Sequence, residues 1–389
     1  MKEGVYMSMD KNIYFKELDK KFSHDYLDLL NLIRNNYSVF ELQKIIKAYQ
    51  IANEAHFNQK RLSGEPFINH PINVAYILAE TGFDSDTVCA ALLHDVVEDT
   101  NYSKEEIKQI FGDTIATLVD GVTKMKGSDF TSKRQSVIAT HKKILDSITK
   151  DARIIAIKLA DRLHNMFTLD YLKEEKQKEI ANETLDFYVN LARILGIYQI
   201  KDELQDLSLF ILDKNEFLSI YELRQELYEG YQNDFMYINN EAIDNLKDIG
   251  VNLNCKYKVK NIGGIYSELS NGIELDKIND LLAIRMIVEN VEDCYKTLGV
   301  VHGICKSVPN TFKDLISNPK YNGYRSLITN VVTPDEGEFQ IRIRTNDMQR
   351  TNELGMVTNW SLKTQEHLNN ECTKIFEANK KELKMKGKK

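Results

Sequence analysis

The sequence is poor in proline and cysteine, and it has no long apolar run. It contains five prolines and five cysteines among 389 residues, and no two cysteines have the C-x-x-C spacing of zinc ribbons and redox motifs. We therefore expect reduced thiols rather than a disulfide framework. No stretch approaches the roughly 18 apolar residues of a membrane span, and the N-terminus has no signal-peptide apolar region. These absences predict a cytoplasmic protein without a membrane partner.

A basic excess is also missing. The formal net charge is −7, whereas binding along a phosphate backbone normally requires a positively charged face. We therefore predict no nucleic-acid partner. The lysine-rich C-terminal segment, 363–389, is typical of a solvated chain end. The usual size of domains predicts two of them in a chain of this length, while the oligomeric state cannot be read from the sequence.

The first domain is predicted to be helical. Over residues 38–246, apolar residues recur at three- and four-residue steps, which is the period of an amphipathic helix. Ser38 with Glu41 and Ser103 with Glu106 have the spacing of capping boxes, in which a serine and a glutamate satisfy N–H groups at a helix start. These pairs predict the beginnings of two helices.

Two further predicted helices carry candidate functional residues. Pro71, directly after His70, has the place of a first helical residue, and Gly82 would end that helix. The segment 152–166 is apolar nearly all round, which predicts a central helix of the bundle. Asp161, within this segment, should therefore point into the core.

Beyond about residue 250 the pattern changes to short strands with one intervening helix at 291–306. The last strand alternates polar and apolar residues with period two, as half-buried strands do. A mixed sheet with flanking helices is the natural outcome. The predicted fold class is therefore α+β, with an all-α domain followed by a mixed α/β domain. We expect the strands at 256–261, 281–289, 326–332 and 338–345.

Four side chains that can bind a metal or transfer a proton lie within six residues of one predicted apolar helix. They are His94, Asp95, Glu98 and Asp99. Because residues four apart stack on a helix, Glu98 lies one turn beyond His94 and Asp99 one turn beyond Asp95. All four are therefore expected to project from one face. Charge in such a place is costly unless it is paired or used.

With His70 and Asp161, this cluster gives a predicted metal site. Two imidazoles and two carboxylates suit a divalent first-row ion, and the oxygen share favours Mn²⁺ or Fe²⁺ over a structural zinc. Four protein ligands leave positions for water and a substrate oxygen, which is a hydrolytic arrangement. Glu98 or Asp99 would take the proton of the water or hold the nucleophile in line. The alternative is an ordinary His94–Asp95 pair at a helix end.

Polar residues near these ligands are candidates for substrate binding. Gly64 predicts a tight loop after Arg61. Arg61 suits contact with a base or a phosphate, and it equally suits an ordinary surface position. His164 and Asn165, one turn past Asp161, are placed to line the same cavity. His164 is consistent with a substrate contact, with a group that orients a ligand, or with a core histidine.

The segments "SGEPFINHP", "LLHDVVEDT", "DGVTK" and "KLADRLHNM" resemble the hydrolase half of the RelA/SpoT homologue family, enzymes that make and degrade the alarmone (p)ppGpp. The segments "INDLLAIRMIV", "FKDLISNPKYNGYRSL" and "IRTNDM" are similar to the synthetase half of the family. The resemblance runs from about residue 42 to Trp360. It implies an HD-type hydrolase domain at 1–181, a helical connector at 182–246 and a nucleotidyltransferase-like synthetase domain at 247–362. We expect the C-terminal regulatory domains of longer members to be absent.

For the first domain, the resemblance implies removal of the 3′-pyrophosphate of (p)ppGpp, which gives GDP or GTP and pyrophosphate. Glu98 and Asp99 would assist the attacking water. Leu62 and Phe167 depart from the family, which commonly has lysine and arginine there, and this puts substrate affinity in doubt. The implied ligands of Mn²⁺ are His70, His94, Asp95 and Asp161, and the implied nucleotide contacts are Arg61, Ser63, Asn165 and Thr168.

The second domain departs further from the family. Gly264 and Glu268 stand where the family carries a serine and a lysine, and Thr311 and Ile328 replace an arginine and a histidine. A glutamate in place of a lysine reverses the charge that meets a triphosphate, so it should repel ATP. The positions that match the synthetase are Lys260, Asp280, Lys313, Lys320, Asn322 and Tyr324.

The position of the family's catalytic glutamate stays open between two registers. Aligning on residues 343–345 puts Gln340 there, and an amide cannot accept the proton of the attacking ribose hydroxyl. Sliding by two residues puts Glu338 there, on the same face of the strand. The lost basic and serine positions favour a disabled synthetase that retains weak guanine-nucleotide binding.

The sequence thus predicts a manganese-dependent (p)ppGpp hydrolase with a pseudo-synthetase domain, and its ligands would be (p)ppGpp, GDP and GTP. One alternative is a bifunctional enzyme that also uses Mg²⁺ to transfer pyrophosphate from ATP to GTP or GDP. A second is an HD-type phosphohydrolase of other nucleotides, including adenine analogues. A third is a catalytically silent nucleotide receptor.

Overall fold

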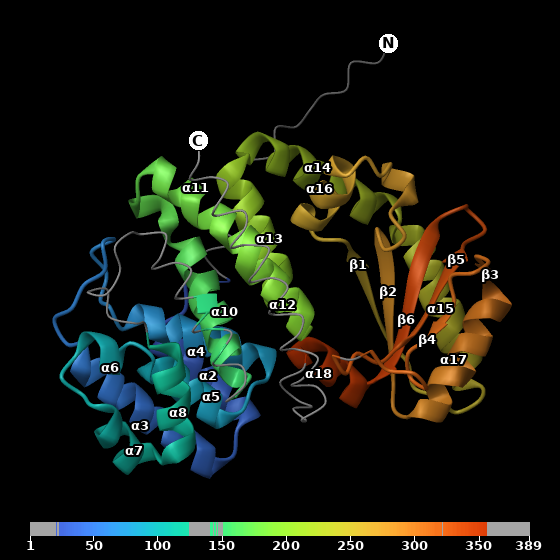
Figure 1. Cartoon of the computed structure of the whole chain (residues 1–389). Coiled ribbons are helices and arrows are strands. Elements are labelled where there is room, and N and C mark those ends of the chain that lie inside the picture. The colour runs from blue at the N-terminus through green and yellow to red at the C-terminus, as the bar shows by residue number, and fades with distance from the viewer. Residues whose placement is uncertain are drawn as a thin grey trace. The chain divides into compact units, whose positions relative to one another are not determined.

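The chain divides into two compact units, Met1–Lys173 and Glu174–Lys389. The computed structural model describes residues 21, 23–123, 141–142, 144, 146, 151–320 and 322–355, which Figure 1 colours along the chain. Trp360 and the lysine-rich segment 363–389 lie outside the described residues. The first unit is helical, and the second adds a mixed sheet to its helices, which is the predicted order of an all-α part and an α/β part.

The first unit is built around one helix, α10. Ile154, Ile155, Ile157 and Leu159 in this helix have no exposed surface, so it is buried nearly all round, as predicted. Helices α4, α5 and α8 pack against it. The described helices of this unit are α2 Tyr26–Asn36, α3 Val39–Ala55, α4 Asn69–Thr81, α5 Ser85–Leu93, α6 Val96–Asp99, α7 Lys104–Phe111, α8 Asp113–Val122, α10 Arg153–Phe167 and the 3₁₀ turn η2 Leu169–Tyr171.

Both predicted capping boxes are confirmed. The Ser38 hydroxyl accepts a hydrogen bond from the Glu41 backbone N–H, and the Glu41 carboxylate accepts one from the Ser38 N–H, at the start of α3. Ser103 and Glu106 form the same reciprocal pair at the start of α7. Each pair satisfies two N–H groups that the first turn of a helix leaves without a partner.

One helix begins earlier than predicted. Helix α4 starts at Asn69, so Pro71 is its third residue rather than its first. Proline is tolerated there because N–H groups in the first turn have no acceptor within the helix. Gly82 ends α4 with a positive φ of 95°, as predicted, because this left-handed conformation is strained for other residues.

The helix expected to run through His94 and Asp99 is interrupted. Helix α5 ends at Leu93, His94 and Asp95 form a turn, and α6 begins at Val96. The prediction that four side chains share one face of one helix is therefore wrong. The His94 imidazole Nδ1 hydrogen-bonds to the Ala91 carbonyl at 2.7 Å, and a continuous α-helix would use that carbonyl for the N–H of Asp95.

The second unit begins with helices that lead into a six-stranded mixed sheet of order β1-β2-β6-β5-β3, with β4 paired to β5. Strands β2 and β6 are parallel, and the other pairs are antiparallel. Its elements are α11 Glu174–Glu183, the π-helical turn η3 Thr184–Val189, α12 Asn190–Leu195, α13 Tyr198–Leu212, α14 Lys214–Gly230, α15 Gln232–Lys247, β1 Asn254–Val259, α16 Ile262–Ser270, η4 Leu275–Lys277, β2 Leu282–Val288, α17 Val291–Ile304, β3 Lys306–Ser307, β4 Lys313–Asp314, β5 Leu327–Val332, β6 Glu338–Thr345 and α18 Asn346–Leu354.

The two faces of this sheet differ in character. Phe339, Ile341 and Ile343 of β6 are fully buried on the face where α15 and α17 lie (Figure 1). On the other face, Glu338 is exposed, Gln340 and Arg342 are partly buried, and Arg344 is buried. This alternation follows from the period of two along a strand. The candidate functional residues of β6 therefore lie on the polar face of the sheet.

The predicted strands are confirmed with shifts at their ends. The last one, Glu338–Thr345, has the predicted bounds, whereas β1 runs over Asn254–Val259 instead of 256–261. The difference arises because Asn261 is already the N-cap residue of α16. Helix α17 ends two residues early, where β3 follows. Strands β3 and β4 were not predicted, since two residues are too few to show a period.

Among the residues that the structure describes, no helix combines the length and the apolar character needed to span a membrane.

Candidate functional site

Three segments of the first unit bring the four predicted metal ligands together. His70 lies in the first turn of α4, His94 and Asp95 lie in the turn between α5 and α6, and Asp161 lies in α10. These helices pack directly on one another. The two histidines are 3% and 2% exposed, and Asp95 is 9% exposed. The interrupted helix does not separate the ligands, because the turn itself carries two of them.

The distances among these side chains suit one cation. His70 Nε2 lies 3.3 Å from Asp161 Oδ1 and 3.8 Å from Asp95 Oδ2. His94 Nε2 lies 3.1 Å from the same Asp95 oxygen. One donor atom each from His70, His94 and Asp161 lies within 4.8 Å of the other two. First-row ions bind such atoms at about 2.0–2.2 Å, so two ligand atoms of one ion lie at most about 4.4 Å apart. These three residues are close to the spacing that one ion needs, and Asp95 lies beside them.

The orientation of His94 is that of a metal ligand. Its Nδ1 lies 2.7 Å from the Ala91 carbonyl, which can only accept, so Nδ1 carries a hydrogen. When the ring is neutral, Nε2 therefore carries the lone pair. Nε2 is buried and forms no hydrogen bond, although it faces Asp95 at 3.1 Å. In the neutral ring the Nε2 lone pair would face the Asp95 carboxylate, and although burial alone would lower the pKa of His94, Asp95 raises it. A bound cation would satisfy both groups.

The charges of the cluster also suit a cation. Burial alone would raise the pKa of Asp161, but Lys158 and the neighbouring imidazoles hold it well below its usual value. The pKa of Asp95 is likewise lowered, against the effect of burial, by His94 and His70. Burial lowers the pKa of His70, which favours the neutral imidazole that a metal requires. The site therefore presents ionised carboxylates at neutral pH.

Three of the four predicted substrate contacts meet beside the ligands. Arg61 Nη2 donates to Asn165 Oδ1 at 2.9 Å and lies 3.4 Å from Thr168 Oγ1. Asn165 Nδ2 in turn donates to Asp161 Oδ1 at 2.6 Å. The Arg61 atom Nη1 is buried without a hydrogen-bond partner. The guanidinium thus stays next to the predicted ligand Asp161, and its Nη1 group still has N–H donors available.

The fourth predicted contact, Ser63, is not part of that group. Its hydroxyl donates to Glu65 Oε1 at 3.1 Å within the loop before α4. Gly64 has a φ of 88° in this loop, which confirms the tight turn. Leu62, which stands where the family commonly has lysine, is 82% exposed.

The predicted catalytic pair lies in the short helix α6. Glu98 is half-buried and Asp99 is exposed. The Asp99 N–H donates to the Asp95 carbonyl at 2.9 Å, and the Asp99 carbonyl accepts a bond from Gln59 at 3.1 Å. The first bond joins α6 to the turn that carries Asp95, and the second joins it to Gln59. Glu98 and Asp99 therefore lie within one turn of Asp95.

Two neighbours of the ligands contact them directly: Lys158, which the sequence analysis did not single out, and His164, for which it left three roles open. Lys158 Nζ lies 3.3 Å from Asp161 Oδ2, and His164 Nδ1 lies 2.9 Å from His70 Nδ1. Both residues lie three positions from Asp161 on α10, which is the spacing that places side chains on one helix face. That spacing is a signal that could have found Lys158.

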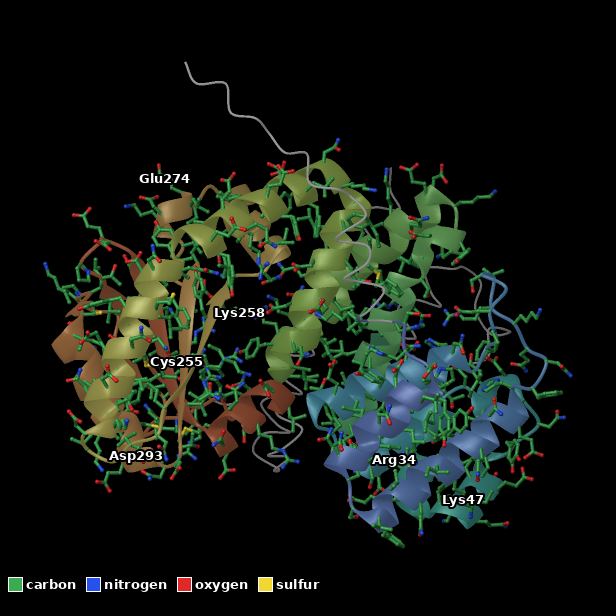
Figure 2. The ribbon with its side chains drawn as sticks, turned by 180° about the vertical axis from the view of Figure 1, so that it is seen from behind. Arg34, Lys47, Cys255, Lys258, Glu274 and Asp293 are labelled. Carbon is green, nitrogen blue, oxygen red and sulfur yellow. The ribbon has the colours of Figure 1, made fainter. Side chains whose placement is uncertain are left out.

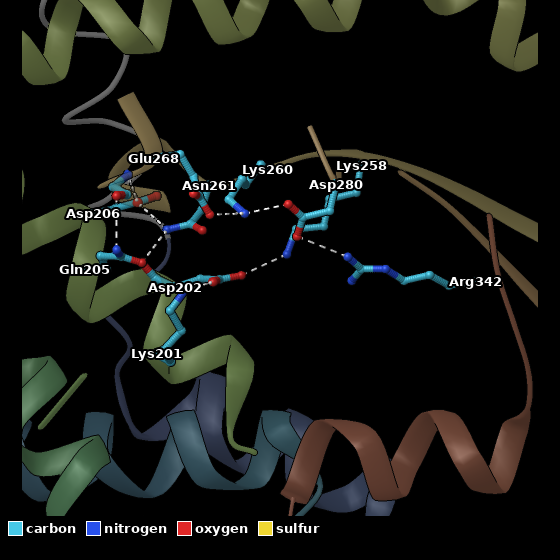
Figure 3. A network of polar contacts seen from close by, with 11 residues as sticks. Lys201, Asp202, Gln205, Asp206, Lys258, Lys260, Asn261, Glu268, Asp280 and Arg342 are labelled. Atoms are coloured by element: carbon cyan, nitrogen blue, oxygen red, sulfur yellow. Dashed lines mark hydrogen bonds and ion pairs between the residues drawn. The ribbon is translucent and has the colours of Figure 1, made fainter. Parts of the chain in front are cut away.

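In the second unit, several predicted synthetase residues form an ion-pair network (Figure 3). Lys260, just after β1, contacts Asp280 Oδ1 at 2.5 Å and Glu268 Oε1 at 3.5 Å. Arg342 of β6 contacts the other Asp280 oxygen at 3.3 Å. Burial would raise the pKa of Asp280, but Lys260 and Arg342 lower it below its usual value. Two cations thus share this carboxylate.

A neighbouring lysine, Lys258, also forms an ion pair with an acidic side chain. Lys258, labelled on β1 in Figure 2, contacts Asp202 of α13 at 2.9 Å. Asp202 is also paired with Lys201 at 2.9 Å. The lysines at the end of β1 are therefore paired with the protein's own carboxylates.

The two candidates for the catalytic glutamate have different partners. Gln340 Oε1 accepts a bond from Arg342 Nε at 2.7 Å, so it lies beside the cation that contacts Asp280. Glu338 Oε1 accepts a bond from Asn330 at 2.8 Å. In this structure the amide, rather than the carboxylate, is linked to the Asp280 network.

The other predicted synthetase residues lie around Tyr324. Lys320 Nζ lies 5.2 Å from the centre of the Tyr324 ring, and Arg344 donates to the Tyr324 hydroxyl at 3.1 Å. Asn322 accepts a bond from the Tyr324 N–H at 3.2 Å. Lys313 is the exception, because it lies exposed on β4, which pairs with β5.

A half-buried carboxylate, that of Asp206, anchors the start of α16 in the same region. Asp206 Oδ1 accepts bonds from the Gly263 N–H at 2.7 Å and from Asn261 Nδ2 at 2.8 Å (Figure 3). Burial nevertheless raises the pKa of Asp206 to about 6. The folded protein therefore binds a proton at this carboxyl over a pH range in which the unfolded chain, with an ordinary pKa of about 3.9, has released it.

This carboxyl should make the stability of the second unit fall as the pH rises from about 4 to about 6. The Asp206→Asn variant cannot ionise, and its amide oxygen can still accept both bonds. We expect equal stability of variant and parent near pH 4, and a more stable variant at pH 8, by at most about 3 kcal/mol. Urea unfolding at both pH values measures the difference. A difference that does not change with pH would contradict the role of this carboxyl.

Comparison with known proteins agrees with the two-part organisation. Residues 48–198 match the family described as HD domain, and residues 250–367 match the region found in RelA / SpoT proteins. The four predicted metal ligands all lie within the first match, and the ion-pair network around Asp280 lies within the second.

Several relatives are similar over most of this chain. It is 41% identical over 339 residues to a GTP pyrophosphokinase of Streptomyces coelicolor, which covers 86% of this chain and 40% of that relative. It is 39% identical over 314 residues to the guanosine-3′,5′-bis(diphosphate) 3′-pyrophosphohydrolase of Haemophilus influenzae, with coverage of 80% and 46%. The protein of the same description from Aquifex aeolicus is 39% identical over 324 residues, with coverage of 82% and 46%.

The chain spans less than half the length of each of these three relatives. Both domain matches occur in the order that the sequence motifs predicted, and the similarity runs across both. The chain belongs to the RelA/SpoT family.

Proposed function

We propose that this chain is a manganese-dependent hydrolase that removes the 3′-pyrophosphate of (p)ppGpp and releases GDP or GTP and pyrophosphate. The observation that carries the proposal is the buried cluster of His70, His94, Asp95 and Asp161, in which His94 Nε2 has no hydrogen-bond partner. Two of the similar relatives bear the name of this activity.

The residues around the cluster suit the steps of such a hydrolysis. His70, His94, Asp95 and Asp161 would hold a divalent ion, which supplies Lewis-acid polarisation of water and of a phosphoryl oxygen. Glu98 and Asp99, within a turn of Asp95, would accept the proton of the attacking water. Arg61 would bind the nucleotide through its unpaired Nη1, while Asn165 and Thr168 hold its other nitrogen.

The second unit is proposed to be a pseudo-synthetase. Its Asp280 carboxylate is shared by Lys260 and Arg342, which compete with a magnesium ion for the same oxygens. Lys260 and Lys258 are paired with Glu268 and Asp202, so their charge is less available to a triphosphate. In one of the two registers, Gln340 occupies the position of the catalytic base, where its amide cannot accept a proton. Guanine nucleotides would remain its ligands.

A bifunctional enzyme is the second candidate. It is favoured by the name GTP pyrophosphokinase of a similar relative and by Glu338, which supplies a carboxylate on the same face of β6 as Gln340. Mg²⁺ would be required only if this synthetase is active.

The hydrolase proposal is tested by adding Mn²⁺ to the metal-free full chain and measuring pyrophosphate and GDP or GTP by anion exchange. The substrates are ppGpp, pppGpp, an adenine analogue, GTP and ATP. We expect release of pyrophosphate from ppGpp and pppGpp only, and none with a chelator present. Comparable turnover of the adenine analogue, GTP or ATP would indicate another nucleotide phosphohydrolase. Unchanged ppGpp after prolonged incubation would indicate a silent receptor.

A further inference from the structure

A second histidine, His164, contacts the ring nitrogen of His70 that faces away from the carboxylates of the site. His164 Nδ1, on α10, lies 2.9 Å from His70 Nδ1, and both residues are 3% exposed. The ring centres are 5.0 Å apart, with the planes tilted by 45°. The other ring nitrogen of His70, Nε2, faces the Asp161 and Asp95 carboxylates. The two nitrogens of His70 therefore have separate partners.

The hydrogen bond between the two rings has a defined direction when a cation is bound. Two imidazole nitrogens at this distance share one hydrogen, because two N–H groups would clash and two lone pairs would repel. A histidine that gives Nε2 to a cation carries its hydrogen on Nδ1. His70 must then donate, and His164 Nδ1 must accept.

We propose that His164 is a positioning residue that fixes the ring orientation and the tautomer of His70, and thereby sets the affinity of the site for a divalent cation. The inference rests on the proposed metal site. Groups that hold the far nitrogen of a ligating histidine act in this way in metalloproteins, and their loss typically weakens metal binding about 10–100-fold.

The two ligand histidines are held by different kinds of acceptor. His94 donates to the backbone carbonyl of Ala91, which no side-chain substitution removes. His70 depends on the side chain of His164, which a single substitution removes. The His70 arm of the site is therefore the one that can be tested by mutation without changing a ligand.

The test compares two replacements of His164 in the metal-free full chain. His164→Phe keeps a ring of similar size and has no acceptor. His164→Asn places an amide oxygen near the position of Nδ1, so it can accept the bond from His70. The measurement is the Kd for Mn²⁺, by titration calorimetry and by the electron paramagnetic resonance signal of free Mn²⁺, with no nucleotide present. We expect a 10–100-fold higher Kd for His164→Phe and recovery of most of the affinity in His164→Asn.

Circular dichroism melting of the metal-free variants reports folding separately, and His164→Ala replaces the phenylalanine variant if that one does not fold. Unchanged Mn²⁺ affinity in the variants without an acceptor would overturn the proposal, as would an equal loss in His164→Asn. If the parent chain binds Mn²⁺ but does not hydrolyse ppGpp, the proposed function fails, and the Mn²⁺ affinities of the variants still decide the role of His164. If the parent chain binds no Mn²⁺, both fail.

Discussion

Replacing Asp161 by alanine should lower kcat/KM for ppGpp by about 10³-fold or more. The variant loses a carboxylate that lies 3.3 Å from His70 and that holds Asn165 next to Arg61. A metal ion contributes several kcal/mol to transition-state stabilisation, and about 1.4 kcal/mol corresponds to a factor of ten in rate. Pyrophosphate release with saturating Mn²⁺ measures the loss, and calorimetry should show that Mn²⁺ affinity falls with it.

Asp120→Ala is the matched control for this variant. Asp120 is an aspartate of the same unit, its side chain is 48% exposed, and it pairs with Lys104 on the surface at 2.9 Å. The control changes the net charge equally, and we expect nearly full activity because exposed ion pairs contribute little to stability. If Asp161→Ala retained the activity of Asp120→Ala, the buried cluster would not be the catalytic metal site.

The second large effect expected is the near absence of ppGpp synthesis. The Asp95→Ala variant, which should not degrade its own product, is incubated with ATP, GDP and Mg²⁺. We expect no accumulation of ppGpp, because Asp280 is paired with two cations. If Gln340 holds the position of the general base, the loss of that base alone costs about 10²–10⁴-fold in rate. Nucleotide chromatography measures the product, and circular dichroism checks that the variant is folded.

Two further variants in the Asp95→Ala background identify the base. If Asp95→Ala accumulates ppGpp and Glu338→Gln abolishes it, the bifunctional alternative is correct and Glu338 is the base. If Gln340→Glu restores synthesis that Asp95→Ala alone lacks, the amide at this position is what disables the domain. Their neighbours on β6 are buried and stay unchanged, so both substitutions leave the strand's packing intact.

The sequence predicted those parts of the fold that depend on local patterns. The capping boxes at Ser38 and Ser103 were found because each depends on two residues three positions apart. The central helix α10 was found because burial on all sides leaves a continuous apolar segment. The eight-residue strand β6 shows several periods of two, whereas β3 and β4 show none.

The turn at His94 and Asp95 shows where a local pattern fails. The spacing of the four polar residues is compatible with a helix, and a bond between the His94 ring and the Ala91 carbonyl decides against it. Such a bond depends on the rotamer of one side chain, which spacing does not specify.

The remaining contacts of the site join residues that are distant in the sequence. Arg61 and Asn165 are 104 positions apart. Lys260, just after β1, and Arg342 of β6 both contact Asp280. Family resemblance supplied candidates for several of these residues. It gave no sign that Arg342 would join the Asp280 pair, because that contact depends on the parallel register of β2 and β6.

Helix α10 carries three residues that contribute to the proposed site in different ways. Asp161 supplies a donor oxygen, His164 holds the ring of His70, and Asn165 holds Arg61. These residues lie within five positions of one rigid element, so a small rotation or axial slide of α10 would displace all three together. Metal retention and nucleotide capture would then be lost in one step rather than separately. A ligand that shifts this helix by a fraction of a turn would therefore switch the proposed hydrolase site between two states without contacting any of its residues.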